Sequence, residues 1–413
     1  LRTTTDGVIV TGILTATEEV AAQLDYPNFT PTLDFNFAAV KKLDPRFTFS
    51  RKGTASYYDE FGNVVMAASN QPRFDHDPDT REAKGLLIEP ERTNTVSTSG
   101  SQYSSDIVGG GVLGGTFQIN DVKADIILPT GESGLVRHLK ADASSSTGMR
   151  WGSTAGGTAG HSYAGGVWAR AVSGTVAVNT DVNDRGAVTH TLTEEWKRVS
   201  SVGTHPSNAH RFFDFFINSA GSEVYIWGVQ LEANVPFLSS YIHVPPGHTS
   251  QTRGADFAKI DGQEFTKFYS PAESTTIMIG QRLGNQQDGR AYSISDGSND
   301  NRIDWDFNDD IHIRFSVASG GTTVTTMQQS NVPDINDEFR IAAAVKLNDQ
   351  IGVVNGTAIS SADTSCAQPV DMDRLYLGLR GNEGNQGALT IKRFMYYPKR
   401  LPNSQLLKLT KKI

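Results

Sequence analysis

Cysteine is almost absent from this chain of 413 residues, because Cys366 is the sole one. An intrachain disulfide and a cysteine metal site are therefore both excluded. Long apolar runs are missing as well: runs such as residues 224–227 fall far short of the roughly 20 residues that a membrane-spanning helix needs. The sequence thus predicts no membrane insertion, and stability that comes from packing and association.

Positive charge is also scarce. Lys and Arg total 37 against 45 Asp and Glu, a net charge of 37 − 45 = −8, and no Lys/Arg cluster occurs. Phosphate neutralisation supplies most of the affinity for nucleic acids, so we expect no nucleic-acid partner. Hydrophobic residues make up 38% of the chain, which is enough for a packed core and argues against disorder.

The motifs of common enzyme classes are missing too. The chain has no His-Glu-x-x-His zinc motif, no Gly-x-Ser-x-Gly elbow and no Walker loop. Residues 109–114 satisfy a dinucleotide fingerprint on paper, but an alternating stretch follows where a helix would be required. The sequence therefore names no catalytic residue, metal site or cofactor, and we expect a protein that is not an enzyme.

What the sequence has in abundance is short segments that alternate apolar and polar residues with a period of two, separated by Gly, Asn, Asp and Ser. Such segments predict strands, and many short strands indicate sandwiches or jelly rolls. Helical patterns occur at residues 17–24 and 404–411. The strands are predicted at residues 116–122, 162–170, 174–182, 211–217, 223–231, 275–282, 310–317 and 338–347.

Composition and turn signals divide the chain into five parts. Residues 1–24 are Thr-rich and too short to bury an apolar face alone, so we expect them to pack against copies of themselves. Residues 25–98 predict a connector of hairpins, with one turn at residues 59–63. Residues 99–245 and 255–413 predict two β-sandwiches around a linker at 246–254, and Asn355-Gly356 predicts a tight hairpin in the second. Leu1 is not an initiator Met, so we expect a processed product or a fragment.

Two stretches are candidates for glycan binding. Asp304 and Asp306 flank Trp305 on a predicted strand, and Trp151 lies among glycines. An exposed indole offers a flat apolar face for a sugar ring, and nearby carboxylates accept from its hydroxyls. The two aspartates, about 6.6 Å apart at strand rise, leave two alternatives open: general acid and base of a glycosidase, or an incidental calcium site.

Three stretches resemble bacteriophage tail-fibre and related virion proteins. Residues 47–94 look like a module of phage structural proteins, residues 225–242 resemble the closing strand of a carbohydrate-binding jelly roll, and residues 275–410 look like a concanavalin A-like, laminin-G-like sandwich. The matching segments are FTFSRKGTA at 47–55, NQPRFDHDP at 70–78, GLLIEPERTN at 85–94, YIWGVQLEA at 225–233, FRIAAAVKL at 339–347 and IKRFMYYPKRL at 391–401.

The resemblance implies an all-β virion appendage, a homotrimer that begins with the end of a fibre shaft and presents its binding domains outermost. Its partners would be other tail or baseplate proteins and a host cell-surface glycan. Two alternatives remain open at this point: a virion depolymerase or glycosidase that acts through Asp304 and Asp306 or through carboxylates from separate strands, and a purely structural capsid or baseplate fibre.

Overall fold

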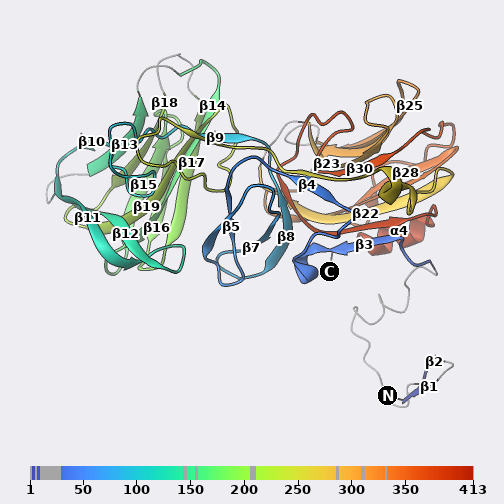
Figure 1. Ribbon diagram of the computed structural model, residues 1–413, viewed down its shortest axis with the longest axis horizontal. Coiled ribbons are helices and arrows are strands. Elements are labelled where there is room, and N and C mark those ends of the chain that lie inside the picture. The colour runs from blue at the N-terminus through green and yellow to red at the C-terminus, as the bar shows by residue number, and fades with distance from the viewer. Residues whose placement is uncertain are drawn as a thin grey trace.

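The computed structural model of this protein describes residues 2–4, 7–9, 29–142, 147–153, 157–204, 211–284, 288–307, 312–330 and 333–412. Antiparallel strands dominate these residues and form two β-sandwiches that lie side by side (Figure 1). The predicted all-β sandwich fold is therefore confirmed. No helix in the described ranges is both long and apolar enough to cross a membrane.

The first sandwich, called here the inserted sandwich, consists of β10 to β19 in two five-stranded sheets. One sheet runs, in spatial order, β10 (Gly111–Gly114), β13 (Thr147–Ser153), β18 (Arg211–Ile217), β15 (Val176–Val182) and β16 (Val188–Leu192). The other runs β11 (Phe117–Ile127), β12 (Ser133–Ala141), β19 (Glu223–Ala233), β14 (Ser162–Ala171) and β17 (Lys197–Thr204). These strands agree with the predicted domain at residues 99–245.

The second sandwich is called here the split sandwich, because its strands come from both sides of the insertion. Its seven-stranded sheet runs β26 (Thr322–Ser330), β25 (His312–Ser319), β24 (Arg302–Phe307), β23 (Gly289–Ser295), β30 (Arg374–Leu377), β21 (Phe257–Asp261) and β4 (Thr48–Ser50). Its eight-stranded sheet runs β29 (Thr357–Ala358), β28 (Asp349–Val354), β27 (Glu338–Lys346), β22 (Glu273–Arg282), β31 (Leu389–Tyr397), β8 (Ala83–Ile88) and β7 (Arg73–His76), with β3 (Leu33–Asn36) also on β31.

The predicted separate connector at residues 25–98 is wrong in one respect. Strands β3 and β8 pair with β31, and β4 pairs with β21, so most of this segment completes the two sheets of the split sandwich. Pairing satisfies the sheet edges and buries Leu33, Phe35 and Leu86 in the shared core. The predicted linker at residues 246–254 contains β20 (Gln251–Arg253). This strand pairs with β9 (Arg92–Asn94) as a two-stranded stem between the sandwiches.

The predicted hairpins and one helix are confirmed. Strands β5 (Ala55–Tyr58) and β6 (Val64–Ala67) flank the turn at 59–63, and β28 and β29 meet at Asn355 and Gly356, both at positive φ as this tight turn requires. Helix α4 (Asn403–Leu409) matches the predicted C-terminal helix, and α2 (Phe37–Val40) and α3 (Gly262–Thr266) are short additions. The helix predicted at residues 17–24 lies outside the described residues.

The first residues form a two-stranded hairpin of β1 (Arg2–Thr4) and β2 (Gly7–Ile9). The chain offers these two three-residue strands no partner among the described strands of the sandwiches. A two-stranded ribbon of this length is marginal in water by itself. Association of residues 1–24 with copies of themselves therefore stays a prediction.

Candidate functional site

The aromatic and acidic side chains predicted to meet a glycan on β24 are buried. Trp305 is 0% exposed and packs against Phe315 in the core, so the prediction that its indole is exposed is wrong. Asp304 and Asp306 share a face of β24, as their spacing predicts, but both are 0% exposed. Arg290 on the neighbouring strand pairs with Asp304 at 3.0 Å and with Asp306 at 3.2 Å. Burial raises the pKa of Asp306 to about 6.

Trp151 is also part of a core, because β13 is an inner strand of its sheet. Its side chain is 3% exposed and stacks on Phe213 with ring centroids 5.9 Å apart. The indole nitrogen donates to the Val108 carbonyl at 3.0 Å. The prediction that this indole is exposed is thus also wrong, and the two tryptophans lie in different sandwiches. None of the four predicted residues offers a surface to a sugar.

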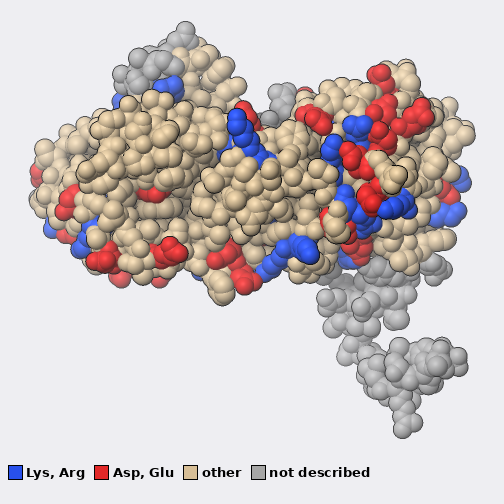
Figure 2. Space-filling model, viewed as in Figure 1, with Lys and Arg blue, Asp and Glu red and all other residues tan. Residues whose placement is uncertain are grey.

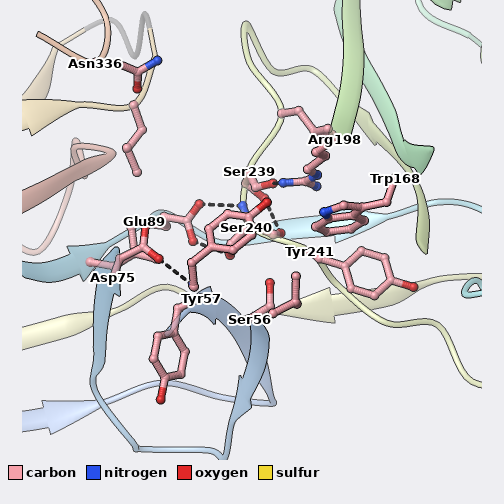
Figure 3. Close-up of a pocket in the computed structure, with 15 residues that line it drawn as sticks. Ser56, Tyr57, Asp75, Glu89, Trp168, Arg198, Ser239, Ser240, Tyr241 and Asn336 are labelled. Atoms are coloured by element: carbon pink, nitrogen blue, oxygen red, sulfur yellow. Dashed lines mark hydrogen bonds between the residues drawn. The ribbon is translucent and has the colours of Figure 1, made fainter. Parts of the chain in front are cut away.

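A pocket of about 240 Å³ lies instead between the two sandwiches (Figure 3). The split sandwich contributes Asp75 from β7, and the β5–β6 hairpin contributes Tyr57. The inserted sandwich contributes Trp168 from β14 and Arg198 from β17, and the returning segment after β19 adds Ser240. The lining therefore combines aromatic faces with charged and hydroxyl groups, which is the composition of small-molecule sites.

Arg198 stands at one end of this pocket. Its Nη1 donates to the Ser239 carbonyl at 2.9 Å, and its guanidinium carbon lies 4.6 Å from the centre of the Trp168 ring. Its Nε and Nη2 are buried, and neither finds a hydrogen-bond partner among the described residues. Arg198, a residue of the pocket lining, therefore has two buried charged donors without a partner among the described residues.

Asp75 marks the other end. Its Oδ1 accepts a hydrogen bond from the Tyr58 amide at 2.7 Å. Burial raises the pKa of Asp75 to about 7, because removal from water disfavours the charged carboxylate more than that hydrogen bond favours it. Near neutral pH the side chain can therefore either donate to or accept from a ligand hydroxyl.

Glu89 connects the pocket to both sandwiches. Its carboxylate accepts from the Ser240 amide at 2.9 Å and from the Ser240 hydroxyl at 2.6 Å, and it pairs with Arg73 at 2.8 Å. Burial alone would raise the pKa of Glu89, but Arg253 and Arg73 outweigh it and hold that pKa well below its usual range. Glu89 thus stays ionised and fixes the returning segment beside the pocket.

Glu89 also belongs to a buried ionic cluster next to the pocket. The cluster is formed by Arg51, Arg73, Glu89, Arg253 and Asp256. Asp256 pairs with Arg73 at 2.6 Å and with Arg51 at 3.1 Å, and Arg253 lies 3.4 Å from Glu89. All five side chains are at most 1% exposed. The cluster joins the chain on both sides of the insertion, so it holds the pocket walls in a fixed relation.

The sequence contained a partial signal for this site. Asp75 and Glu89 lie in the segments at 70–78 and 85–94 that resemble a phage structural module, although no role was predicted for either residue. Trp168 lies on the strand predicted at residues 162–170 and is only 3% exposed, yet it also lines the pocket. Arg198 was missed, because one arginine on an alternating strand resembles any solvated position.

No metal centre emerges from the described residues, since they contain no group of three His, Cys, Asp or Glu side chains able to hold an ion. The calcium site considered as an alternative includes Asp304, Asp306 and the acidic residues that follow them up to Asp310. Its two aspartates on β24 are paired with arginines, and residues 308–311 lie outside the described residues.

No family model matches this sequence, and no curated protein matches it either. Among solved structures, the chain is similar to the CBM40 module of Ruminococcus gnavus IT-sialidase bound to α2,3-sialyllactose, at 13% identity and a TM-score of 0.31, covering 35% of this chain and 84% of that one. The chain is also similar to domain 4 of AbnA, a GH43 extracellular arabinanase of Geobacillus stearothermophilus in complex with arabinotriose. The sequence identity is 14% and the TM-score 0.29, and the match covers 38% of this chain and 73% of that one. A heptameric SAP-like pentraxin of Limulus polyphemus matches at 9% identity and a TM-score of 0.25, over 33% of this chain and 68% of that one.

These likenesses are distant and each spans about a third of the chain.

Proposed function

We propose that this chain is a non-catalytic receptor-binding protein of a bacteriophage tail fibre, and that it attaches the virion to glycans on the host surface. The observation that supports this proposal best is the pocket between the sandwiches. Tyr58 and Trp168 supply apolar ring faces, while Asp75, Ser240 and Arg198 supply hydrogen-bonding groups. Sugar recognition needs both kinds of surface, because a pyranose ring has an apolar C–H face and a rim of hydroxyls.

The phage assignment rests on the resemblance of residues 47–94, 225–242 and 275–410. A fibre also suits the proposed trimer, because several weak sites on one particle raise avidity by orders of magnitude. The virion location, the trimer and the contacts with other tail or baseplate proteins are parts of this same proposal.

The enzymatic alternative names one pair of residues, Asp304 and Asp306, beside carboxylates from separate strands that the sequence does not identify. Asp304 and Asp306 are enclosed by arginines and cannot reach a polysaccharide. A glycosidase needs two accessible carboxyl groups about 5 to 9.5 Å apart on either side of the scissile bond. We therefore favour binding without cleavage, which an assay for reducing ends released from host polysaccharide tests directly.

Binding is tested by applying the intact chain to an array of host-surface and reference glycans. We expect the unchanged chain to bind at least one glycan and Tyr58→Ala, shown to be folded by thermal unfolding, to lose that binding. Phe61→Ala is the matched control, because Phe61 is 68% exposed on the turn of the same hairpin and does not line the pocket. Failure of the intact chain to bind any glycan or host cell, with assembly onto particles retained, would favour the purely structural fibre.

A further inference from the structure

We propose that Arg198 binds an oxyanion carried by a sugar, so that the pocket selects acidic glycans over neutral ones. This inference rests on the proposed glycan-binding function and specifies its ligand class. The oxyanion is a carboxylate, as in uronic or sialic acids, or a phosphate ester. Both present two oxygens to the paired donors of a guanidinium.

The geometry of Arg198 suits this role. The hydrogen bond from Nη1 to the Ser239 carbonyl and the stacking on Trp168 fix the plane of the guanidinium. Its position is therefore set before any ligand arrives, which lowers the entropy cost of binding. The edge formed by Nε and Nη2 is the one without a partner among the described residues. A fixed fork of two charged donors is the arrangement that recognises carboxylate and phosphate.

A purely structural role explains Arg198 less well. Arg51 and Arg73, the buried arginines of the ionic cluster, each pair with a carboxylate at 3.1 Å or closer. Arg198 has no ion pair with any residue that the structure describes. Buried donors without partners cost about 1–3 kcal/mol each and are rare in native proteins. An anionic ligand would remove that cost.

The acidic groups of the pocket leave room for an anion at this end. Figure 3 shows Arg198 and Trp168 toward one side of the segment that contains Ser239, and Asp75 and Glu89 toward the other. Glu89 is already neutralised by Arg73 and Arg253, at 2.8 and 3.4 Å. The uncharged lining between them, including Ser240 and Tyr58, can contact sugar hydroxyls and ring faces.

Long-range attraction would contribute little to this recognition. On the face shown in Figure 2, acidic and basic side chains are interspersed over the split sandwich, and the inserted sandwich is largely uncharged. A polyanion would need a broad basic surface, whereas a single acidic group needs only one well-placed arginine. The inference therefore concerns one charged group per binding site.

The test compares three oligosaccharides of equal length by isothermal titration calorimetry with the intact chain. One bears glucuronate, one is the same sugar after reduction of its carboxyl groups, and one bears a phosphate ester. We expect the neutral sugar to bind about 10- to 100-fold more weakly than one of the charged sugars, the worth of a charged hydrogen bond. Preference for glucuronate or for phosphate identifies the source of the oxyanion.

Substitutions at position 198 test whether Arg198 causes the preference for a charged sugar. Arg198→Gln should abolish the preference for the charged sugar, and Arg198→Lys should weaken it, because an ammonium keeps the charge but lacks the fork. Lys197→Gln removes the same charge from the exposed neighbouring position and should change nothing. Thermal unfolding of each variant confirms that it is folded.

Equal affinity for charged and neutral sugars would overturn the inference and leave the proposed function standing. A charge preference that survives in folded Arg198→Gln would also overturn it. Absence of binding to all three sugars and to the glycan array would overturn the proposed function itself.

Discussion

Glu89→Gln is the substitution that best tests how the two sandwiches are held together. Glu89 is 1% exposed, and it faces Arg73, Arg253 and the amide and hydroxyl of Ser240. Glutamine has nearly the same shape but carries no charge, and its NH₂ group would point a donor at groups that are donors themselves. The substitution therefore breaks the electrostatic contact with little change in volume.

The expected magnitude follows from the charges of the cluster. Three arginines, Arg51, Arg73 and Arg253, oppose two carboxylates, Glu89 and Asp256, for a net charge of 3 − 2 = +1. The variant would leave 3 − 1 = +2 in the same buried volume. Removal of one partner from a buried pair costs about 3–5 kcal/mol. We expect a loss of this order in the free energy of unfolding.

Urea unfolding of the intact chain, followed by fluorescence and by circular dichroism, measures this loss. Glu91→Gln is the control, because Glu91 is exposed two positions away, and surface changes of this kind usually stay within about 0.5 kcal/mol. A loss for Glu89→Gln no larger than that of the control would refute the account of the cluster as the connection between the sandwiches.

The pH dependence of the same difference provides a second check. The folded-state pKa of Glu89 is depressed below the value of about 4.5 that applies to the unfolded chain. Its contribution is therefore fully present above that value and is lost as the pH falls toward the folded pKa. The stability difference between the unchanged chain and Glu89→Gln should shrink as the pH falls below about 4.5. A difference that grows on acidification would contradict this reasoning.

Three further predictions concern the pocket, the core and the assembly. Asp75 has a folded pKa raised to about 7 from 3.8, so it destabilises the fold increasingly as the pH rises from 3.8 to 7, by at most about 1.4 kcal/mol per unit. Asp75→Asn should therefore be more stable than the unchanged chain at pH 8 and similar at pH 4 in urea unfolding, and a gap independent of pH would contradict this. Trp305→Ala should cost about 3–5 kcal/mol in the same assay without changing the glycan affinity of the folded protein, as its indole is in the core. Sedimentation velocity should show a trimer for the intact chain and a monomer after deletion of residues 1–24; a stable monomer before deletion would count against the trimer.

Local patterns in the sequence were sufficient for the strands and the tight turns. The segment predicted at 174–182 alternates and ends at turn residues, and β15 (Val176–Val182) lies within it with a burial pattern of period two. Asn355-Gly356 determines its hairpin by backbone preference alone. These features depend on neighbours within a few residues, so a sequence records them directly.

The pairing of distant strands could not be predicted in this way. Leu86 on β8 lies opposite Ile391 on β31, about 300 residues along the chain, and no local pattern indicates that partner. The segment before the insertion therefore looked like a domain of its own. The boundaries of the inserted sandwich were easier, because its strands pair among themselves.

The prediction of a glycan site on β24 was wrong for a related reason. Alternation places Asp304 and Asp306 on one face of a strand and Trp305 on the other, as the structure has them, but it does not say which face is covered. Arg290 and Arg314, from the two neighbouring strands, cover the acidic face. The pocket that replaces this site draws residues from several separate segments, so it exists only once the chain has folded.

The split of the second sandwich by the first also dictates an order of events during synthesis. Strands β3, β4 and β8 leave the ribosome early, yet their partners β21 and β31 emerge only after the inserted sandwich is complete. The inserted sandwich can therefore fold while the earlier strands wait with open edges and uncovered apolar faces. Those waiting strands are the part of the nascent chain most exposed to mispairing and aggregation, and the most in need of a chaperone.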